Sequence, residues 1–317
     1  MSRNILLTGA TGFVGGAIAK KLVIEDRYAL SVVSRRASDL KSYDKVHLVP
    51  NIDSSTDWTE ALVCCDVVVH GAARVHVMNE DAGDPLNAFR EVNVGGTLAF
   101  ARQAVAAGVK RFIFISSIKV NGEGTPLGKP YNASDAPIPE DAYGQSKLEA
   151  EQGLVQLSIE TGLEVVIIRP PLVYGPGVKG NFASMIKLVE KGLPLPLGAT
   201  HNKRSMVGID NLVDLIIRCI DHPAAANQVF LAGDGEDLST TELLQGVCRA
   251  MGKPARLVPL PTNLLLFGAR LLGKKAIANR LLGSLQVDIS KTRELLSWKP
   301  PYTVEEGLRH CFTTRKD

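Results

Sequence analysis

Cysteine and histidine are scarce in this chain, and neither forms a pattern that binds metal. The 317 residues include five cysteines and six histidines. The cysteines are scattered and odd in number, Cys64 and Cys65 are adjacent, and no pair has the spacing of metal ligands. The histidines show no ligand spacing either. These absences predict that there is no metal site and that the protein is reduced and cytoplasmic.

Long basic blocks and long apolar runs are also missing. No Lys/Arg block exceeds two residues and the net charge is only +3, so we expect no nucleic-acid partner. The N-terminus leads directly into an apolar run, which argues against a signal peptide. Residues 264–272 are apolar but broken by Gly268 and Arg270, and are too short to insert across a membrane. We expect a helix that covers a second lobe, with a membrane-surface helix as the alternative.

Apolar runs alternate with helical segments in the first half of the chain. Continuous Val/Ile runs indicate strands buried on both faces, as in a parallel sheet. Their alternation with helices predicts a Rossmann-type, doubly wound α/β fold. Strands are expected over 5–7, 30–33, 46–49, 67–69, 112–115 and 164–168, and helices over 13–23, 86–107, around Tyr143 and over 210–221.

The pattern changes after Arg169, where Pro170-Pro171 and Gly175-Pro176-Gly177 interrupt the regular segments. We therefore predict one domain over residues 1–178 and a smaller C-terminal substrate lobe over 179–317. The lobe is expected to pack on the carboxyl edge of the sheet, and residues 210–232 are expected to rejoin the first domain.

A glycine-rich turn follows the first strand and opens a helix. Its glycines permit a tight turn and a close approach of backbone amides to phosphate. The helix N-terminus supplies partial positive charge for a pyrophosphate. The first domain is thus predicted to bind a dinucleotide, and the residues assigned to this contact are Gly9, Thr11, Gly12, Phe13, Val14 and Gly15.

Two arginines end the second strand, where NAD-binding proteins usually place an acid for the ribose 2′-hydroxyl. Arg35 and Arg36 would attract a 2′-phosphate, and no acid appears before Asp39. This favours NADP(H), with NAD(H) as the alternative cofactor. Two solvated surface arginines are the plain structural alternative.

The ends of the third and fourth strands supply further predicted cofactor contacts. Asn51 could bond the adenine amine, and Ile52 could cover the adenine ring. Ala72 and Ala73 follow the fourth strand, where small residues let the backbone approach the cofactor. A purely structural role for these small residues fits almost as well.

Tyr143 and Lys147 stand four residues apart, 26 residues after the Ser116-Ser117 pair that ends an apolar run. On a helix these two positions share one face. The ammonium of Lys147 is then expected to lower the pKa of the Tyr143 phenol. A serine hydroxyl from the preceding strand can bond the same reacting oxygen, which gives a proton donor matched to a carbonyl or alcohol.

With these motifs in order, the chain resembles the extended short-chain dehydrogenase/reductase family. Within that family it is similar to the NAD-dependent epimerase/dehydratase branch, which acts on nucleotide sugars. The resemblance covers nearly the whole chain. The segments that carry it are 9–15 (glycine motif), 92–97 (Asn-containing helix), 114–117 (serine strand), 169–177 (segment that passes the nicotinamide) and 290–300 (C-terminal motif).

The resemblance implies a role for several single residues. Ser117 would be the catalytic hydroxyl and Tyr143 the general acid/base, while Lys147 would orient the ribose and tune Tyr143. Asn93 would hold the structure around Lys147. The residues implied to lie at the cofactor are Asn93, Ser116, Tyr143, Lys147, Pro170, Leu172 and Val173.

The resemblance also implies a sugar-nucleotide site. Asn181 and Phe182 lie where the family contacts a substrate pyrophosphate, and Arg204 lies where it clamps one; Arg suits bidentate phosphate contacts. Arg280 is assigned as a second phosphate arginine. The remaining predicted substrate contacts are Arg74, Ser117 and Lys119.

The missing acid after the second strand determines the expected reaction. A net reductase exchanges its cofactor and usually uses NADPH, whereas an epimerase keeps its cofactor. Segments 74–80 and 118–122 resemble UDP-2-acetamido-4-keto-6-deoxyhexose reductases of surface polysaccharide synthesis, such as lipopolysaccharide synthesis. We therefore expect an NADP-dependent reductase. The alternatives are a UDP-hexose 4-epimerase with tightly bound NAD and a non-catalytic nucleotide sensor. The resemblance further implies a homodimer built on a four-helix bundle.

Overall fold

The structure, a computed structural model, describes residues 2–36, 43, 45–75, 84–271, 273 and 275–313. Its centre is a sheet of seven strands in the order β3-β2-β1-β4-β5-β6-β9. Every neighbouring pair in this order is parallel. The strands are β1 (Arg3–Thr8), β2 (Tyr28–Ser34), β3 (Val46–Leu48), β4 (Val67–His70), β5 (Arg111–Ile115), β6 (Glu164–Arg169) and β9 (Gln228–Leu231). The predicted Rossmann-type fold is confirmed.

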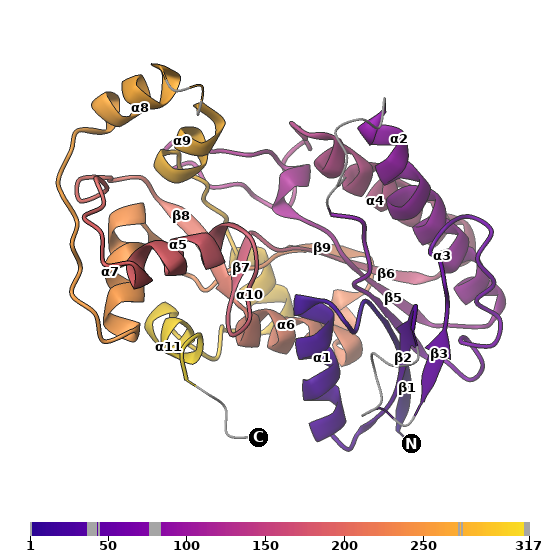
Figure 1. The fold of residues 1–317 in the computed structure, drawn as a ribbon. Helices are drawn as coiled ribbons and strands as arrows, with labels where there is room; N and C mark the ends of the chain where they lie inside the picture. Colours follow the sequence, from indigo (N-terminus) through magenta and orange to yellow (C-terminus); the bar gives the residue numbers. More distant parts are fainter. Residues whose placement is uncertain are drawn as a thin grey trace.

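Helices cover both faces of this sheet (Figure 1). On one face α1 (Phe13–Ile24) and α6 (Ile209–Asp221) share a buried apolar cluster with β1 and β4. On the other, α3 (Thr97–Ala106) and α4 (Ala142–Thr161) do the same. Because both faces are covered, strands such as β4 are buried along their whole length, which explains their unbroken apolar runs.

The single helix expected over 86–107 is divided into three parts. α2 (Pro85–Arg90) continues into a π-helical segment, Glu91–Gly96, before α3 begins. Gly96 lets this π-helical segment lie close to Ile52, because an added Cβ at position 96 would lie 3.0 Å from that residue. Such π segments are frequent at functional sites, and here the segment carries Asn93.

The C-terminal part forms a smaller lobe with its own core. A second sheet has the order β10-β8-β7, built from β7 (Leu172–Tyr174), β8 (Arg204–Gly208) and β10 (Asp237–Leu238). Side chains from α5 (Asn181–Glu190), α7 (Thr240–Ala250) and α11 (Val304–His310) pack into one buried cluster around it. α6 and β9 lie with the large sheet, and α10 (Ser290–Leu296) packs beside β9. The domain boundary at residue 178 stays a prediction.

A hairpin of two helices, α8 (Thr262–Leu271) and α9 (Lys275–Leu282), projects from this lobe (Figure 1). None of the ten residues of α8 is buried. The expectation that this stretch covers the second lobe is therefore wrong for α8, because a covering helix buries one face. Within the described part of the chain, no helix is both long and apolar enough to cross a membrane.

Candidate active site

The glycine-rich turn at the start of α1 has the shape of a phosphate cradle. Gly9 has a φ of 79°, a conformation that favours glycine. A Cβ on Gly15 would lie 2.1 Å from the Gly9 carbonyl oxygen, so any side chain there would displace the turn. Gly12 is the N-cap of α1 and offers no capping side chain, which leaves the first amides of the helix available to an anion. These residues fit a dinucleotide pyrophosphate.

A buried histidine that the sequence analysis did not single out supports this turn. The Thr8 hydroxyl accepts from the backbone N–H of Ala72 (3.2 Å) and lies 2.7 Å from Nδ1 of His70. Nε2 of His70 lies 3.0 Å from the Thr97 hydroxyl. Burial, with a smaller effect from the charge of Lys147, lowers the pKa of His70 to about 3, so the ring is neutral. The available signal was a histidine that ends an otherwise all-valine strand.

The predicted contacts for the rest of the cofactor line the same edge. Arg35 and Arg36 are exposed at the end of β2, and neither has an ion pair among the described residues. Asp39 lies outside the described residues. Asn51 is exposed, and Ile52 packs against the cluster under α3. Ala72 and Ala73 are half-buried.

The catalytic candidates meet where β5 ends and α4 begins. Ser117 caps the short 3-10 turn Ile118–Val120, and its Oγ accepts from the backbone N–H of Lys119 (3.3 Å). Tyr143 lies in the first turn of α4, and its ring packs edge-on against Phe89, with ring centroids 5.9 Å apart. A Cβ on Gly144 would lie 2.7 Å from the Lys119 carbonyl oxygen, so this glycine permits the close approach of the two segments.

Lys147 is 1 % exposed, and no carboxylate of the described residues lies within ion-pair distance of its amine. Its Nζ donates to the Ile115 carbonyl (2.7 Å) and lies 3.8 Å from the centre of the Phe114 ring. Burial lowers the pKa of Lys147 to about 7, and the nearby charge of Glu151 opposes this shift only in part. The lysine thus fixes α4 to the end of β5.

The expected effect of Lys147 on Tyr143 is not found. Burial raises the pKa of Tyr143 to about 12, and the charge of Asp141 adds to the increase. The prediction assumed a charged lysine beside the phenol. In the structure, burial disfavours the ammonium form and the amine is directed to the Ile115 carbonyl.

Ser116 belongs to a buried polar network. Its hydroxyl donates to Glu151. Glu151 pairs with Arg169 through contacts of 2.5 and 3.0 Å, and Nη1 of Arg169 donates to the Asn121 side chain (3.0 Å). The assignment of Ser116 to cofactor binding stays a prediction, and its hydroxyl already has a protein partner. Asn121 therefore has a structural role, because its side chain accepts a hydrogen bond from the buried Arg169.

Asn93 has the structural role that the resemblance implied. Its side chain accepts from the backbone N–H of Arg74 (2.8 Å) and donates to the Arg74 carbonyl (3.0 Å). It also donates to the Ser146 hydroxyl (3.0 Å), which in turn donates to the Tyr143 carbonyl (2.8 Å). The loop after β4 and the helix that carries Tyr143 are therefore joined by one side chain.

Two predicted substrate residues have other roles. Lys119 pairs with Asp141 and with Glu123, the latter at 2.8 Å, and Asp141 also caps α4 by accepting from the Gly144 N–H (2.6 Å). Burial alone would lower the pKa of Lys119, but the two carboxylates raise it overall. Phe182 is fully buried against Tyr174 in the lobe core, so it does not face a ligand. The side chain of Asn181 lies outside the described residues.

Arg204 keeps the features of an anion site. Nη1 donates to the Gly283 carbonyl (3.0 Å), and no carboxylate pairs with the guanidinium within the described ranges. Burial lowers its pKa. Arg280 is exposed on α9. Pro170 accepts from the Ile118 N–H through its carbonyl (3.0 Å), and Leu172 and Val173 are half-buried on β7.

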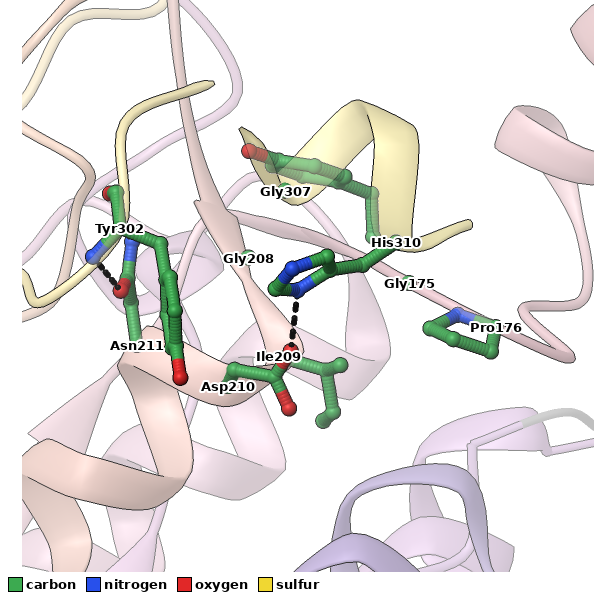
Figure 2. Close-up of a pocket in the computed structure, with 10 residues that line it drawn as sticks. Gly175, Pro176, Gly208, Ile209, Asp210, Asn211, Tyr302, Gly307 and His310 are labelled. Atoms are coloured by element: carbon green, nitrogen blue, oxygen red, sulfur yellow. Dashed lines mark hydrogen bonds and ion pairs between the residues drawn. The ribbon is translucent and has the colours of Figure 1, made fainter. Parts of the chain in front are cut away.

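A small cavity lies where β7 and β8 of the lobe meet the start of α6 and α11 (Figure 2). Its volume is about 10 Å³, which is room for one water molecule. Asp234 lies beside it and accepts from Tyr174 (2.8 Å) and Asn211 (2.7 Å), and Nδ1 of His310 lies 2.9 Å from Asp210. These contacts join the lobe to α6. The cavity is too small for a sugar.

A phosphate-cradling turn followed by Ser117, Tyr143 and Lys147 at the carboxyl edge of a Rossmann-type sheet defines a dinucleotide-dependent enzyme. The chain belongs to the NAD dependent epimerase/dehydratase family, which matches residues 5–233. The prediction of an NAD(P)-dependent enzyme of this family is confirmed.

Known relatives of the chain extend over nearly all of its length. A UDP-glucose 4-epimerase from Vibrio cholerae is 53% identical over 98% of this chain and 94% of its own. An N-acetyl-α-D-glucosaminyl-diphospho-ditrans,octacis-undecaprenol 4-epimerase from Escherichia coli O157:H7 is 28% identical over 97% of this chain and 94% of its own. Among solved structures, a UDP-N-acetylglucosamine 4-epimerase from Bacillus cereus has a TM-score of 0.79, with 21% identity over 97% of both chains, and shows the same fold.

The expectation of an NADP-dependent 4-keto-sugar reductase is wrong. The 53% identical relative is a 4-epimerase. The error came from treating cofactor recognition as a sign of the reaction. A contact between Arg35 or Arg36 and a cofactor phosphate would not determine whether the enzyme returns the hydride to the same sugar.

Proposed function

We propose that the protein is a UDP-hexose 4-epimerase. The observation that supports this most strongly is the 53% identity to a UDP-glucose 4-epimerase over 98% of the chain, together with an intact Ser117, Tyr143 and Lys147. In this reaction the C4 hydroxyl is oxidised to a carbonyl and then reduced from the opposite face, with no net redox change.

Each residue of the site has a separate role in this reaction. Tyr143 removes the proton of the C4 hydroxyl and later returns it, and Ser117 bonds the same oxygen. Gly9, Gly12 and Gly15 hold the dinucleotide pyrophosphate at the N-terminus of α1. A dinucleotide held there would supply the group that exchanges hydride with C4, and its positive charge would favour the Tyr143 phenolate. Lys147 holds α4 against β5.

The UDP group supplies binding energy away from the reacting carbon. Arg204 is suited to grip its pyrophosphate, because most of its donors have no protein partner and it has no competing carboxylate in the described lobe. Arg204 is half-buried, so water screens its charge less and a contact with phosphate is stronger than on the open surface.

For the cofactor, the two exposed guanidinium groups of Arg35 and Arg36 support a preference for NADP, and NAD is the alternative. A Bacillus cereus UDP-glucuronic acid 4-epimerase of the same fold was solved with NAD. We also propose a homodimer that uses α3 and α4, because Val155 and Ile159 on α4 are exposed beside an apolar groove of about 190 Å³. Sedimentation that shows a monomer at micromolar concentration would contradict the dimer.

A second candidate substrate is a sugar joined by diphosphate to a polyprenol, as in the name of the Escherichia coli relative. The exposed apolar surface of α8 favours including it. Both substrates share the sugar-diphosphate group that Arg204 would contact.

The test is incubation of the purified protein with UDP-glucose, UDP-N-acetylglucosamine and N-acetylglucosaminyl-diphospho-undecaprenol, without added reductant. The proposal expects C4 epimers to form until a fixed ratio is reached, with no lasting change in absorbance of the reduced nicotinamide. Stoichiometric consumption of NADPH, or no epimer from any of the three, would refute it. Faster conversion of the lipid-linked sugar would select the second candidate.

A further inference from the structure

The α8 helix presents an unpartnered apolar stripe to solvent. Leu264, Phe267 and Leu271 are 55%, 60% and 72% exposed. Their spacing of three and four residues places them on one side of the helix. α8 packs mainly on α9, and the hairpin lies at the end of the lobe farthest from the seven-stranded sheet (Figure 1). The body of the protein therefore leaves this stripe uncovered.

The same hairpin is strongly cationic. From Thr262 to Val287 the sequence contains four basic residues, Arg270, Lys274, Lys275 and Arg280, and no acidic residue. The acid-free stretch begins at Leu243 and contains seven Lys/Arg, which leaves 29 Lys/Arg against 33 Asp/Glu in the rest of the chain. The positive net charge of the protein thus comes from this region. Arg270 and Arg280 are exposed, and neither has an ion pair within the described ranges.

We propose that α8 docks the protein on an anionic lipid surface. Leu264, Phe267 and Leu271 would enter the boundary between headgroups and acyl chains, while Arg270 and Arg280 contact lipid phosphates. A helix of ten residues is about 15 Å long, which suits a helix lying in the interface and not one that spans it. This inference stands whether or not the proposed epimerase activity is correct.

The combination of charge and apolar surface selects lipid over other occupants. A second copy of the chain would place two hairpins of equal positive charge face to face, which is unfavourable. A nucleic acid would use the cations but leave the Leu264, Phe267 and Leu271 stripe in water. An anionic bilayer surface satisfies both features of the hairpin at once.

The experiment is vesicle flotation of the full chain. Wild type is expected to float with vesicles of phosphatidylglycerol and phosphatidylethanolamine, weakly with pure phosphatidylcholine, and less as salt rises. The variant Leu264→Ser/Phe267→Ser/Leu271→Ser should partition at least about tenfold less, because it loses three buried apolar side chains. Arg270→Gln should partition about fivefold less. Circular dichroism verifies that each variant is folded.

A matched control is Ile24→Ser, since Ile24 is 75% exposed at the end of α1, a helix that packs on the large sheet. It should float like wild type. Several results would overturn the proposal: no flotation of the wild type, equal binding to phosphatidylcholine, or equal loss in the Ile24 variant. Unchanged flotation of the triple variant with a smaller sedimenting species would also overturn it and would indicate a second copy as the occupant. Retained heparin binding without flotation would indicate a polyanion site.

Discussion

The burial of Lys147 should make the folded protein less stable at neutral pH than a variant without this charge. The pKa of Lys147 falls from 10.5 to about 7, mainly because the amine is buried. That difference corresponds to about 5 kcal/mol between the two protonation states. We therefore predict that Lys147→Met, which keeps a similar shape, stabilises the nucleotide-free protein while abolishing turnover.

The sign and the pH window follow from proton linkage. Below about pH 7 the lysine is charged in both the folded and the unfolded chain, and the folded state carries the full penalty. Between about pH 7 and 10.5 the unfolded chain binds a proton that the folded chain does not, so wild-type stability rises with pH. The advantage of Lys147→Met should therefore be largest near pH 6 and shrink steadily as pH rises towards 10.5.

The expected gain is smaller than the full penalty. The variant loses the hydrogen bond to the Ile115 carbonyl, worth about 1 kcal/mol, and the contact with the Phe114 ring, worth about 1 kcal/mol. A gain of about 3 kcal/mol near pH 6 remains.

Urea unfolding at about pH 6, 8 and 10 measures this difference. The control is Lys20→Met, because Lys20 is exposed on α1 and its removal should change stability by less than about 0.5 kcal/mol at every pH. A destabilised Lys147→Met at pH 6, or a gain that does not shrink as pH rises, would refute the reasoning.

The remaining predictions concern the site. Tyr143→Phe should keep the fold and lose about 10² to 10⁴ in epimer formation, since a positioned acid/base contributes that much; near-normal turnover would contradict its role. Gly144→Ala should destabilise by about 1–3 kcal/mol and lower turnover, because its Cβ would lie 2.7 Å from the Lys119 carbonyl; urea unfolding and kinetics without change would exclude this packing argument. Arg35→Ala/Arg36→Ala should weaken NADP binding about tenfold or more and leave NAD unchanged in calorimetry; equal effects on both would show that the arginines do not read the phosphate. Arg204→Ala should weaken UDP binding by about 2 kcal/mol and leave the dinucleotide affinity unchanged; an equal loss for both would place the substrate elsewhere.

The large sheet and the cofactor turn were predictable from the sequence because each rests on a local signal. Unbroken Val/Ile runs predict strands buried on both faces, and the first helix begins directly after the turn from Gly9 to Gly12. The structure adds the reason that these glycines are required, which is the 2.1 Å approach at Gly15. The division of the 86–107 helix was not predictable, because a π segment changes hydrogen bonding and leaves apolar spacing nearly unchanged.

The parts of the site that the sequence analysis missed depend on contacts between distant residues. Asp141 precedes α4 as a typical N-cap, and that local signal could have identified it. Its pairing with Lys119 could not have been read from the sequence, because it depends on how β5 and α4 meet. The same limit explains Phe182, whose motif position suggested a ligand contact while packing placed it in the lobe core.

The arrangement of α4 shows why the site needs a polar buried helix face. Tyr143, Lys147 and Glu151 follow one another at intervals of four residues, so they share the face that α4 turns toward the ends of β5 and β6. An amphipathic helix would place apolar residues there. Here Lys147 is bound to the Ile115 carbonyl, and Glu151 binds both Ser116 and Arg169. These contacts hold the ends of β5 and β6, next to Ser117, against the helix that carries Tyr143.

Replacing Glu151 alone would leave the Arg169 guanidinium buried and without a carboxylate partner, which is strongly destabilising. The contacts that hold Ser117 and Tyr143 in position therefore also stabilise the domain. These contacts come from the buried polar side chains on this face of α4.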